Sequence, residues 1–362
     1  MKKTILLLVA ILFGGAKLMA EGLVATLQQG ETMTAFYGVN AFVDAYNAAE
    51  DGAVITLSEG RFNDVSSIEK SITVIGNMAF DVEGYEKTYL ANDGDVTINA
   101  DNVTLEGIYW SDSYRLILGN ISNCHIRRCR IGYRLDCSVN TTHTNTLIDQ
   151  CVVNLIYLFP ASKNLCIKNS TIYSFFGATG NTANVGYVSN CYIKRFFGRA
   201  WDSDSQIPYA IYKNNVLVFD NNSYSGYACY LKSPSEYYNN YFLYYGSYSI
   251  SKVSIYINTG CINQGNVFSE NVSAGNNNAP TNFIIDSFGM LGDDGTPVGI
   301  TGGSGFSPYP SIPRVTSKQI DSRTDSQGKL NVKITVSTEE TLVKEKTDTP
   351  ETGETTEETT TR

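Results

Sequence analysis

Two stretches of the chain repeat one pattern: CIKNSTIYSFFG (166–177) and YVSNCYIKRFFG (187–198). Each has an apolar residue, one free position, an Asn, a small residue, an Ile two positions later, and a closing Phe-Phe-Gly. The two asparagines, Asn169 and Asn190, are 21 residues apart (190 minus 169). A repeat of this length is typical of a solenoid, in which each unit buries its apolar face against its neighbours.

The same pattern recurs along the middle of the chain. Its amide-rich third position is occupied by Arg128, Gln150, Asn169, Asn190, Asn214, Asn239 and Gln264, at separations of 22, 19, 21, 24, 25 and 25 residues. LEGIYW (105–110) resembles one further, degenerate repeat. Each repeat holds short alternating segments rich in β-branched and aromatic residues, which indicate strands rather than helices.

These features predict an all-β protein: a parallel β-helix in which each repeat is one coil. Equivalent residues then stack about 4.8 Å apart. The amide at the third position suits a coil corner, and stacked amides can hydrogen-bond along their column. The next residue lies inside the corner and is expected to be small. Residues at that position are Cys129, Cys151, Ser170, Cys191 and Gly265, with Asn215 and Asn240 as larger exceptions.

The chain has eight cysteines, and at least three of them occupy the small corner position. Cys151 and Cys191 are two coils apart, too far for a disulfide. Cys129 and Cys151 lie on adjacent coils, where the strand direction disfavours a bridge. We therefore expect these three to be buried free thiols. The others remain unassigned: Cys124, Cys137, Cys166, Cys229 and Cys261.

The two ends differ in composition from the body. Residues 1–20 have lysines, a short apolar run and small residues, which predict a secretory signal peptide and hence an exported protein. The rest has no stretch apolar enough to span a membrane. Residues 338–362 are rich in Thr and Glu and are expected to be a disordered acidic tail. The net charge of −9 argues against a nucleic-acid partner.

A resemblance enters upstream of the repeats, in residues 40–77, where a short amphipathic helix precedes strands separated by Gly turns. This stretch resembles the N-terminal cap and first coil of right-handed parallel β-helix proteins of the pectin-lyase-like superfamily. The positions that carry the resemblance are Gly52, Ile55, Leu57, Gly60, Phe62, Ile68, Lys70, Ile72, Val74 and Gly76. It implies a right-handed solenoid whose end is covered by the helix.

Residues 294–303 and 328–336 resemble the last coil and tail of exported β-helix proteins from Gram-negative bacteria. The expected organisation is a signal peptide (1–20), a capped β-helix (21–305), a Pro-rich linker (306–314), a small β segment (315–337) and the acidic tail (338–362). The superfamily includes polysaccharide lyases, glycoside hydrolases, esterases, adhesins and phage tailspikes. The resemblance therefore implies a fold but no single activity.

The catalytic motifs known in lyases and polygalacturonases of that superfamily are absent, and the chain has only two histidines. The first catalytic candidate is the basic stretch 125–136. Its Arg127, Arg130 and Arg134 could bind the carboxylate of an acidic glycan, since Arg offers paired donors.

The alternative for this stretch is structural. Arg127, Asp149 and Lys168 occupy one outward column on successive coils, so their charges alternate like a surface salt-bridge ladder. Arg128 would then continue the corner column by donating to Gln150.

The second candidate is residues 199–206, expected to form a loop. Its Trp201 could stack on a sugar, and Asp202 and Asp204 could bind calcium or act as an acid–base pair. The alternative is a polar loop whose Trp covers the coil edge. The sequence indicates no other cofactor.

Tyrosines are concentrated in the later coils and could stack on pyranose rings along one flank. Stacked aromatics that only stabilise neighbouring coils are the alternative. The candidate ligand-binding tyrosines are Tyr224, Tyr227, Tyr230, Tyr237, Tyr238 and Tyr241. We therefore expect a non-catalytic, carbohydrate-facing surface or secreted protein. A lyase or hydrolase acting on acidic glycans and a structural adhesin remain alternatives.

Overall fold

A computed structural model describes two separate units of the chain. The described residues are 22–82, 85–91, 94–137, 143–158, 164–177, 184–196, 209–220, 228–231, 235–245, 254–257, 261–269, 290–307, 309, 314–320 and 332–337. The main unit runs from Gly22 to Pro310, and β30 (Arg314–Ile320) and β31 (Val332–Ser337) belong to the other. The predicted signal peptide and acidic tail lie outside the described residues.

Two large sheets form the main unit. Sheet A contains, in spatial order, β2 (Thr32–Tyr37), β1 (Val24–Gln29), β3 (Val54–Leu57), β6 (Thr73–Ile75), β9 (Thr104–Glu106), β13 (His125–Arg127), β16 (Thr146–Asp149), β18 (Leu165–Lys168), β20 (Asn184–Ser189), β22 (Tyr209–Lys213), β25 (Glu236–Tyr238) and β28 (Ile262–Gln264). Sheet B contains β4 (Gly60–Asn63), β7 (Thr88–Ala91), β10 (Tyr109–Trp110), β14 (Arg130–Cys137), β17 (Val152–Leu158), β19 (Thr171–Gly177), β21 (Tyr192–Arg195), β23 (Val216–Asp220), β26 (Tyr241–Tyr245) and β29 (Val267–Ser269), with β5 (Ser67–Ile68), β8 (Val96–Ile98) and β11 (Arg115–Leu118) alongside.

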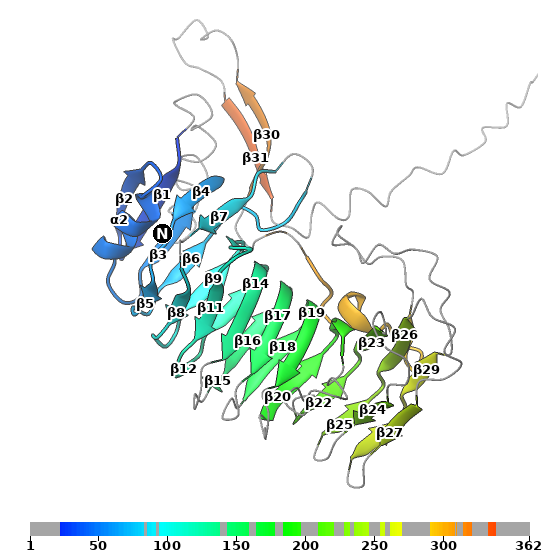
Figure 1. The fold of residues 1–362 in the computed structure, drawn as a ribbon. Coiled ribbons are helices and arrows are strands. Elements are labelled where there is room, and N and C mark those ends of the chain that lie inside the picture. Colours follow the sequence, from blue (N-terminus) through cyan, green and yellow to red (C-terminus); the bar gives the residue numbers. More distant parts are fainter. Residues whose placement is uncertain are drawn as a thin grey trace, which may run out of the picture. The chain divides into compact units, whose positions relative to one another are not determined.

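Smaller pairs complete the strands: β12 (Ile121–Ser122) with β15 (His143–Thr144), and β24 (Ala228–Leu231) with β27 (Ser254–Ile257). From β3 onward each strand of sheet A runs parallel to the next. Figure 1 shows the strands of the two sheets following one another along the chain, from blue β3 to yellow-green β29. The predicted parallel β-solenoid is confirmed. β30 and β31 pair antiparallel, in agreement with the predicted C-terminal β segment.

The core consists of inward-facing columns. The central residues of the sheet A strands are in register and buried: Val74, Leu105, Ile126, Ile148, Ile167, Val188, Tyr212 and Tyr237. Alternation in each strand sends their neighbours outward, so one register error would turn the apolar column to solvent. The repeated apolar residue of the sequence pattern is therefore the core position.

The corner between the two sheets confirms the special role of the third position of the repeat. Arg128, Asn169 and Asn239 have φ angles of 50°, 45° and 50°, in the left-handed region where Asn is tolerated. Our alignment was wrong in the last repeat. Gln264 pairs with Tyr238, so Gly265, with φ 62°, occupies the corner.

An interior column of asparagines lies one residue beyond this corner. Asn215 and Asn240 are completely buried, and the Asn215 Nδ2 donates to Asn240 Oδ1 at 2.9 Å. Asn240 Nδ2 donates in turn to Asn266 Oδ1 at 2.9 Å. These residues were expected to be exceptions to the small-residue rule. Hydrogen bonds to neighbouring coils satisfy their amides, which makes burial of the larger polar side chains tolerable.

Cysteine and serine fill the same interior position in earlier coils. Cys129, Cys151 and Cys191 are buried free thiols, as predicted. Ser170 Oγ accepts a hydrogen bond from the backbone N–H of Cys151 at 3.0 Å. The interior position therefore takes either a small side chain or an amide that bonds along the column.

A second corner precedes the sheet A strands and was missed in the sequence. Asn102, Asn123, Asn145 and Asn164 all have positive φ angles. Their exposed side chains also form a ladder: Asn123 Nδ2 donates to Asn102 Oδ1 at 3.0 Å, and Asn145 Nδ2 to Asn123 Oδ1 at 3.1 Å. Their spacing matches that of the first column, so the same repeat search could have found them.

The N-terminal end is capped by helix α2 (Ala41–Ala48), as predicted. Its Phe42, Ala45 and Tyr46 are buried against the first coils. The Lys70 Nζ donates to the carbonyl oxygens of Tyr46, Asn47 and Ala49 at 2.8, 3.2 and 2.9 Å. A cation suits the C-terminal end of a helix, where the last carbonyls lack their usual donors four residues further on. Within the described residues no helix has the length and apolarity to cross a membrane.

A returning segment, residues 290–307 and 309, runs back along the corner between the sheets, and we call it the strap. The Asn239 Nδ2 donates to Asp294 Oδ1 at 2.9 Å, and the Gly299 N–H donates to the Asn214 carbonyl at 2.8 Å. Figure 1 shows its short 3₁₀ turn, η2 (Gly299–Thr301), as the orange coil beside β23.

The strap continues toward the earlier coils. The Asn169 Nδ2 donates to the Gly302 carbonyl at 2.7 Å, and the Ser307 N–H donates to Gln150 Oε1 at 3.1 Å. Side-chain amides of the corner column thus bond to the strap as well as to one another.

The strap also covers part of the outer face of sheet B. Val298 and Ile300 belong to a buried apolar cluster with Tyr192 and Val216. Phe306 contacts Phe80 with ring centroids 5.4 Å apart. Phe306 lies in the stretch predicted as a linker, yet it packs on the solenoid. Sheet B is therefore covered at these coils by nonrepeating chain.

Candidate functional site

The outer face of sheet A carries the predicted charge ladder. Arg127 pairs with Asp149, and Asp149 with Lys168, in the strand register. The Arg127 Nε and the Lys168 Nζ lie 3.9 and 3.6 Å from Asp149 Oδ2. The side chains of Arg127 and Lys168 are 34% and 36% exposed. The ladder interpretation of these residues is confirmed.

Arg128 also has the structural role that the alternative interpretation predicted, because it bonds to Gln150 in the corner column. Its Nε donates to Gln150 Oε1 at 2.9 Å, and its Nη1 lies 3.2 Å from Glu106 Oε1. Its side chain is only 10% exposed. These contacts leave Arg128 little access to an external carboxylate.

Arg130 and Arg134 lie on β14 in sheet B, away from Arg127 on sheet A. The Arg130 guanidinium lies 4.8 Å from the ring centre of Tyr109, and 3.7 Å separates its Nη1 from Asp81 Oδ2. The arginines of the basic stretch are therefore distributed over two sheets and a corner. They do not converge on one carboxylate site.

Arg134 belongs to a separate ionic cluster. It pairs with Asp136, and its guanidinium lies 4.3 Å from the ring centre of Tyr157. Arg115 lies 3.3 Å from Asp136 and also pairs with Asp95. Burial raises the pKa of Asp136, whereas both arginines oppose that rise. Because the Asp136 side chain is only 2% exposed, a substrate would have to displace an arginine to reach it.

The tyrosine predictions have different outcomes. Tyr237 is fully buried, and its ring stacks on Tyr212 with centroids 5.0 Å apart. The expectation that Tyr237 binds a ligand outside the coil is wrong. The signal was present in the sequence, because Tyr237 occupies the apolar core position of its repeat. Tyr241 packs partly buried against the strap's apolar cluster.

Tyr238 points outward on sheet A, where its hydroxyl donates to Glu236 Oε2 at 2.8 Å. Other candidates fall outside what the structure describes: Trp201, Asp202, Asp204, Tyr224 and Tyr227. Tyr230 lies within β24, but its side-chain environment is also outside the description.

The outer face of sheet A brings together residues that the sequence did not single out. One outward column runs through Leu147, Cys166, Tyr187 and Ile211, all half-buried. Burial raises the pKa of Tyr187 above its usual value. This column offers an aromatic ring between apolar neighbours.

A polar column lies beside it, two residues further along each strand. It continues from Lys168 through Ser189 and Lys213 to Tyr238. Lys213 is exposed, as is Gln264 on the last coil. The face thus combines flat apolar surface with hydrogen-bonding groups, a combination suited to amphipathic ligands.

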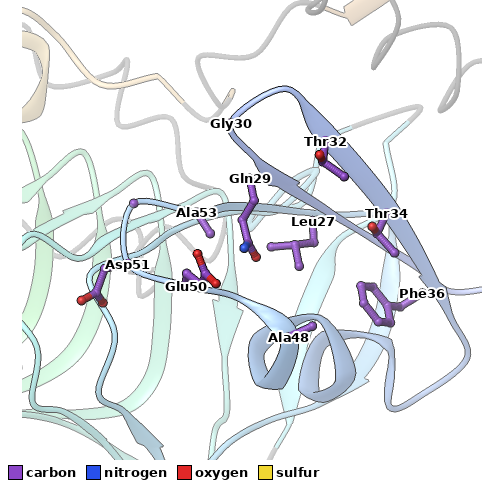
Figure 2. A pocket seen from close by; sticks show the side chains of 11 residues that line it. Leu27, Gln29, Gly30, Thr32, Thr34, Phe36, Ala48, Glu50, Asp51 and Ala53 are labelled. Carbon is purple, nitrogen blue, oxygen red and sulfur yellow. The ribbon is translucent and has the colours of Figure 1, made fainter.

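A groove of about 540 Å³ lies at the opposite, capped end of the sheet. Figure 2 shows Gln29 of β1 and Thr32 and Thr34 of β2 on one side, with Glu50 and Asp51 of the α2–β3 connection on another. Glu50 and Asp51 are exposed, and the Oε1 atom of Gln29 is buried without a hydrogen-bond partner. The groove is accordingly rich in hydrogen-bond acceptors.

The described residues contain no group of three or more His, Cys, Asp or Glu side chains that could hold a metal ion. His143, one of the two histidines, is fully buried in β15, where burial lowers its pKa to about 4. A buried neutral imidazole of this kind is a core group rather than an accessible base.

The strand register defines the class of protein: a capped parallel β-solenoid whose sheet B is partly covered by a strap. No protein-family model matches the sequence, and a search of curated proteins finds no match. The resemblance to the pectin-lyase-like superfamily therefore stays a prediction.

Proposed function

We propose that the protein is an exported, non-catalytic solenoid that binds polysaccharide along the outer face of sheet A. The observation that carries this proposal is the pairing of two columns on that face. Tyr187 stands among apolar neighbours, and a polar column, in which Ser189 is buried and Lys213 is exposed, runs beside it. An aromatic face can stack on the apolar face of a sugar ring while adjacent polar groups bond to its hydroxyls.

The shape of the surface supports an extended ligand. Outward residues recur on successive strands about 4.8 Å apart, so equivalent contacts repeat along the solenoid axis. Tyr238 follows Lys213 in the polar column, and its hydroxyl is held by Glu236. A polymer chain crossing several coils could therefore meet Tyr187 and Tyr238 together.

The non-catalytic part of the proposal rests on the arginines. Arg127, Arg130 and Arg134 each pair with a carboxylate of the protein. A uronate would have to compete with these internal partners, and separating a largely buried carboxylate such as Asp136 from its arginines is costly.

Retention on immobilised neutral and uronic-acid polysaccharides tests the proposal. Tyr187→Ala and Tyr238→Ala should each weaken retention roughly 3- to 10-fold, the equivalent of one lost aromatic contact. Tyr133→Ala is the matched control, because Tyr133 is 41% exposed but lies on β14 of sheet B. Circular dichroism should show that all three variants keep the wild-type fold.

Absence of retention on every polymer would refute carbohydrate binding and favour a structural adhesin. A product assay covers the enzymatic alternative. If the wild-type protein generates new unsaturated or reducing polysaccharide ends, and Arg127→Ala or Arg130→Ala does not, the hypothesis of a non-catalytic protein is refuted.

A further inference from the structure

The N-terminal cap ends in an open strand edge. β1 and β2 form a hairpin of six antiparallel pairs, closed by the two-residue turn Gly30–Glu31. Gly30 has φ 56°, which suits the first position of a tight hairpin turn. Among the described strands, β2 pairs with β1 alone, so its other side is an edge of sheet A.

The exposed edge offers backbone hydrogen-bonding groups. Gln29 and Thr32 are the pair that closes the turn. Alternation along an antiparallel ladder then directs the N–H and C=O groups of Met33, Ala35 and Tyr37 away from β1. Ala35 and Tyr37 are exposed, the latter at 73%.

β2 lacks the usual features that protect an edge from pairing. Its sequence, TMTAFY, has no Lys and no Pro, and its register with β1 continues without a bulge. Edge strands of soluble proteins are commonly blocked by one of these features. An unblocked edge of six residues is long enough to accept another strand.

The acceptor-rich groove lies beside this edge, as Figure 2 shows. Glu50 is exposed at its rim, and Gln29 Oε1 is buried there without a partner. The nearby Lys70 is occupied by the carbonyls at the end of α2. The groove therefore favours a positively charged donor such as an ammonium or guanidinium group.

The negative charge of the N-terminal cap indicates which kind of partner the β2 edge can bind. Residues 22–60 contain Glu31, Asp44, Glu50, Asp51 and Glu59, and no Lys, Arg or His. A second copy paired edge to edge would bring two acidic caps together, and like charges across an interface are unfavourable. A basic strand meets the same edge with complementary charge.

We propose that the β2 edge and the adjoining groove bind an extended basic peptide segment by strand addition. Backbone groups of the peptide pair with Met33, Ala35 and Tyr37. Every second side chain points to the same face of a strand, so Lys or Arg at alternate positions would reach the acidic groove.

Fluorescence anisotropy of a labelled Lys-Thr-Lys-Thr-Lys-Thr peptide with the full chain tests this proposal. A Glu-Thr alternating peptide of the same length is the peptide control. Glu50→Gln should weaken binding of the basic peptide roughly 3- to 5-fold, as expected for one charge pair near a surface. Glu59→Gln removes the same charge outside the groove and should leave the affinity unchanged.

Ala35→Pro removes one edge donor and should abolish binding, since Pro is tolerated on an edge strand but cannot pair there. Circular dichroism and the melting temperature show whether Ala35→Pro folds. If it does not fold, the comparison of Glu50→Gln with Glu59→Gln still tests the proposal. Equal weakening by Glu50→Gln and Glu59→Gln, or full affinity of a folded Ala35→Pro variant, would overturn the proposal. So would a concentration-dependent dimer that Ala35→Pro dissociates, because the occupant would then be a second copy.

Discussion

Replacing Asn240 with Ala should destabilise the solenoid strongly, because Asn240 links three coils inside the core. Its Oδ1 accepts hydrogen bonds from the backbone N–H and the side-chain Nδ2 of Asn215, at 3.0 and 2.9 Å. Its Nδ2 donates to the Tyr212 carbonyl and to Asn266 Oδ1, both at 2.9 Å. All four bonds are lost in the alanine variant.

The magnitude follows from which partners are left without a bond. Asn215 Nδ2 keeps a bond to the Val188 carbonyl, and Asn266 Oδ1 keeps one from the Asn240 backbone. The backbone N–H of Asn215 loses its acceptor in a fully buried position. One buried unsatisfied donor costs about 1–3 kcal/mol and each of the other three bonds about 1 kcal/mol, so we expect a loss of about 4–6 kcal/mol.

Equilibrium urea unfolding followed by circular dichroism measures this loss. Asn240→Ser leaves a similar cavity but restores an acceptor, as Ser170 does for Cys151, and should recover about 1–2 kcal/mol relative to Ala. Asn123→Gly removes an amide from the exposed ladder without strain at positive φ, and should cost less than about 1 kcal/mol. A loss for Asn240→Ala no larger than that for Asn123→Gly would refute the reasoning.

Three further predictions concern other parts of the solenoid. Burial lowers the pKa of His143 to about 4, whereas the pKa in the unfolded chain is about 6.5, so the unfolded state binds more protons between these values. The free energy of unfolding should therefore fall by up to about 3 kcal/mol as the pH drops from about 6.5 to about 4. Urea unfolding of His143→Gln should show a weaker dependence on pH. Gly302→Ala would place a Cβ 2.8 Å from Asn190 Oδ1, and this overpacking should lower the free energy of unfolding by about 1–3 kcal/mol. Amide hydrogen exchange should become faster in the strap but not in α2. A thiol reagent should label the half-buried Cys166 and Cys261 of the native chain before any of the fully buried cysteines. Peptide mass spectrometry identifies the labelled residues, and earlier labelling of a buried cysteine would contradict the prediction.

The interior of the solenoid could be predicted from the sequence because it repeats. Ile126, Ile148 and Ile167 recur at the coil spacing and stack in register. The ladder from Arg127 to Lys168 follows from the same register, since strand alternation sends these residues outward together. Periodicity therefore determines which residues are neighbours within a column.

The same reasoning failed where a column changes its chemistry. In the last repeat Gly265, rather than Gln264, lies at the corner, where Gly adopts the positive φ without a Cβ clash. Tyr237 was assigned to the surface by its residue type, although its place in the repeat is a core position. Position in the repeat was a better guide than the chemistry of the side chain.

What covers the outside of the columns could not be predicted, because the strap has no period. Its Val298, Gly302 and Phe306 match no repeat, and their contacts span more than a hundred residues of sequence. A repeating chain makes successive coils equivalent, so a nonrepeating segment is needed to distinguish one stretch of the surface from another. The strap does this by covering part of sheet B, whereas none of its described contacts reaches the outer columns of sheet A or the β2 edge. We therefore expect a polysaccharide on the outer columns of sheet A rather than on the coils of sheet B that the strap covers.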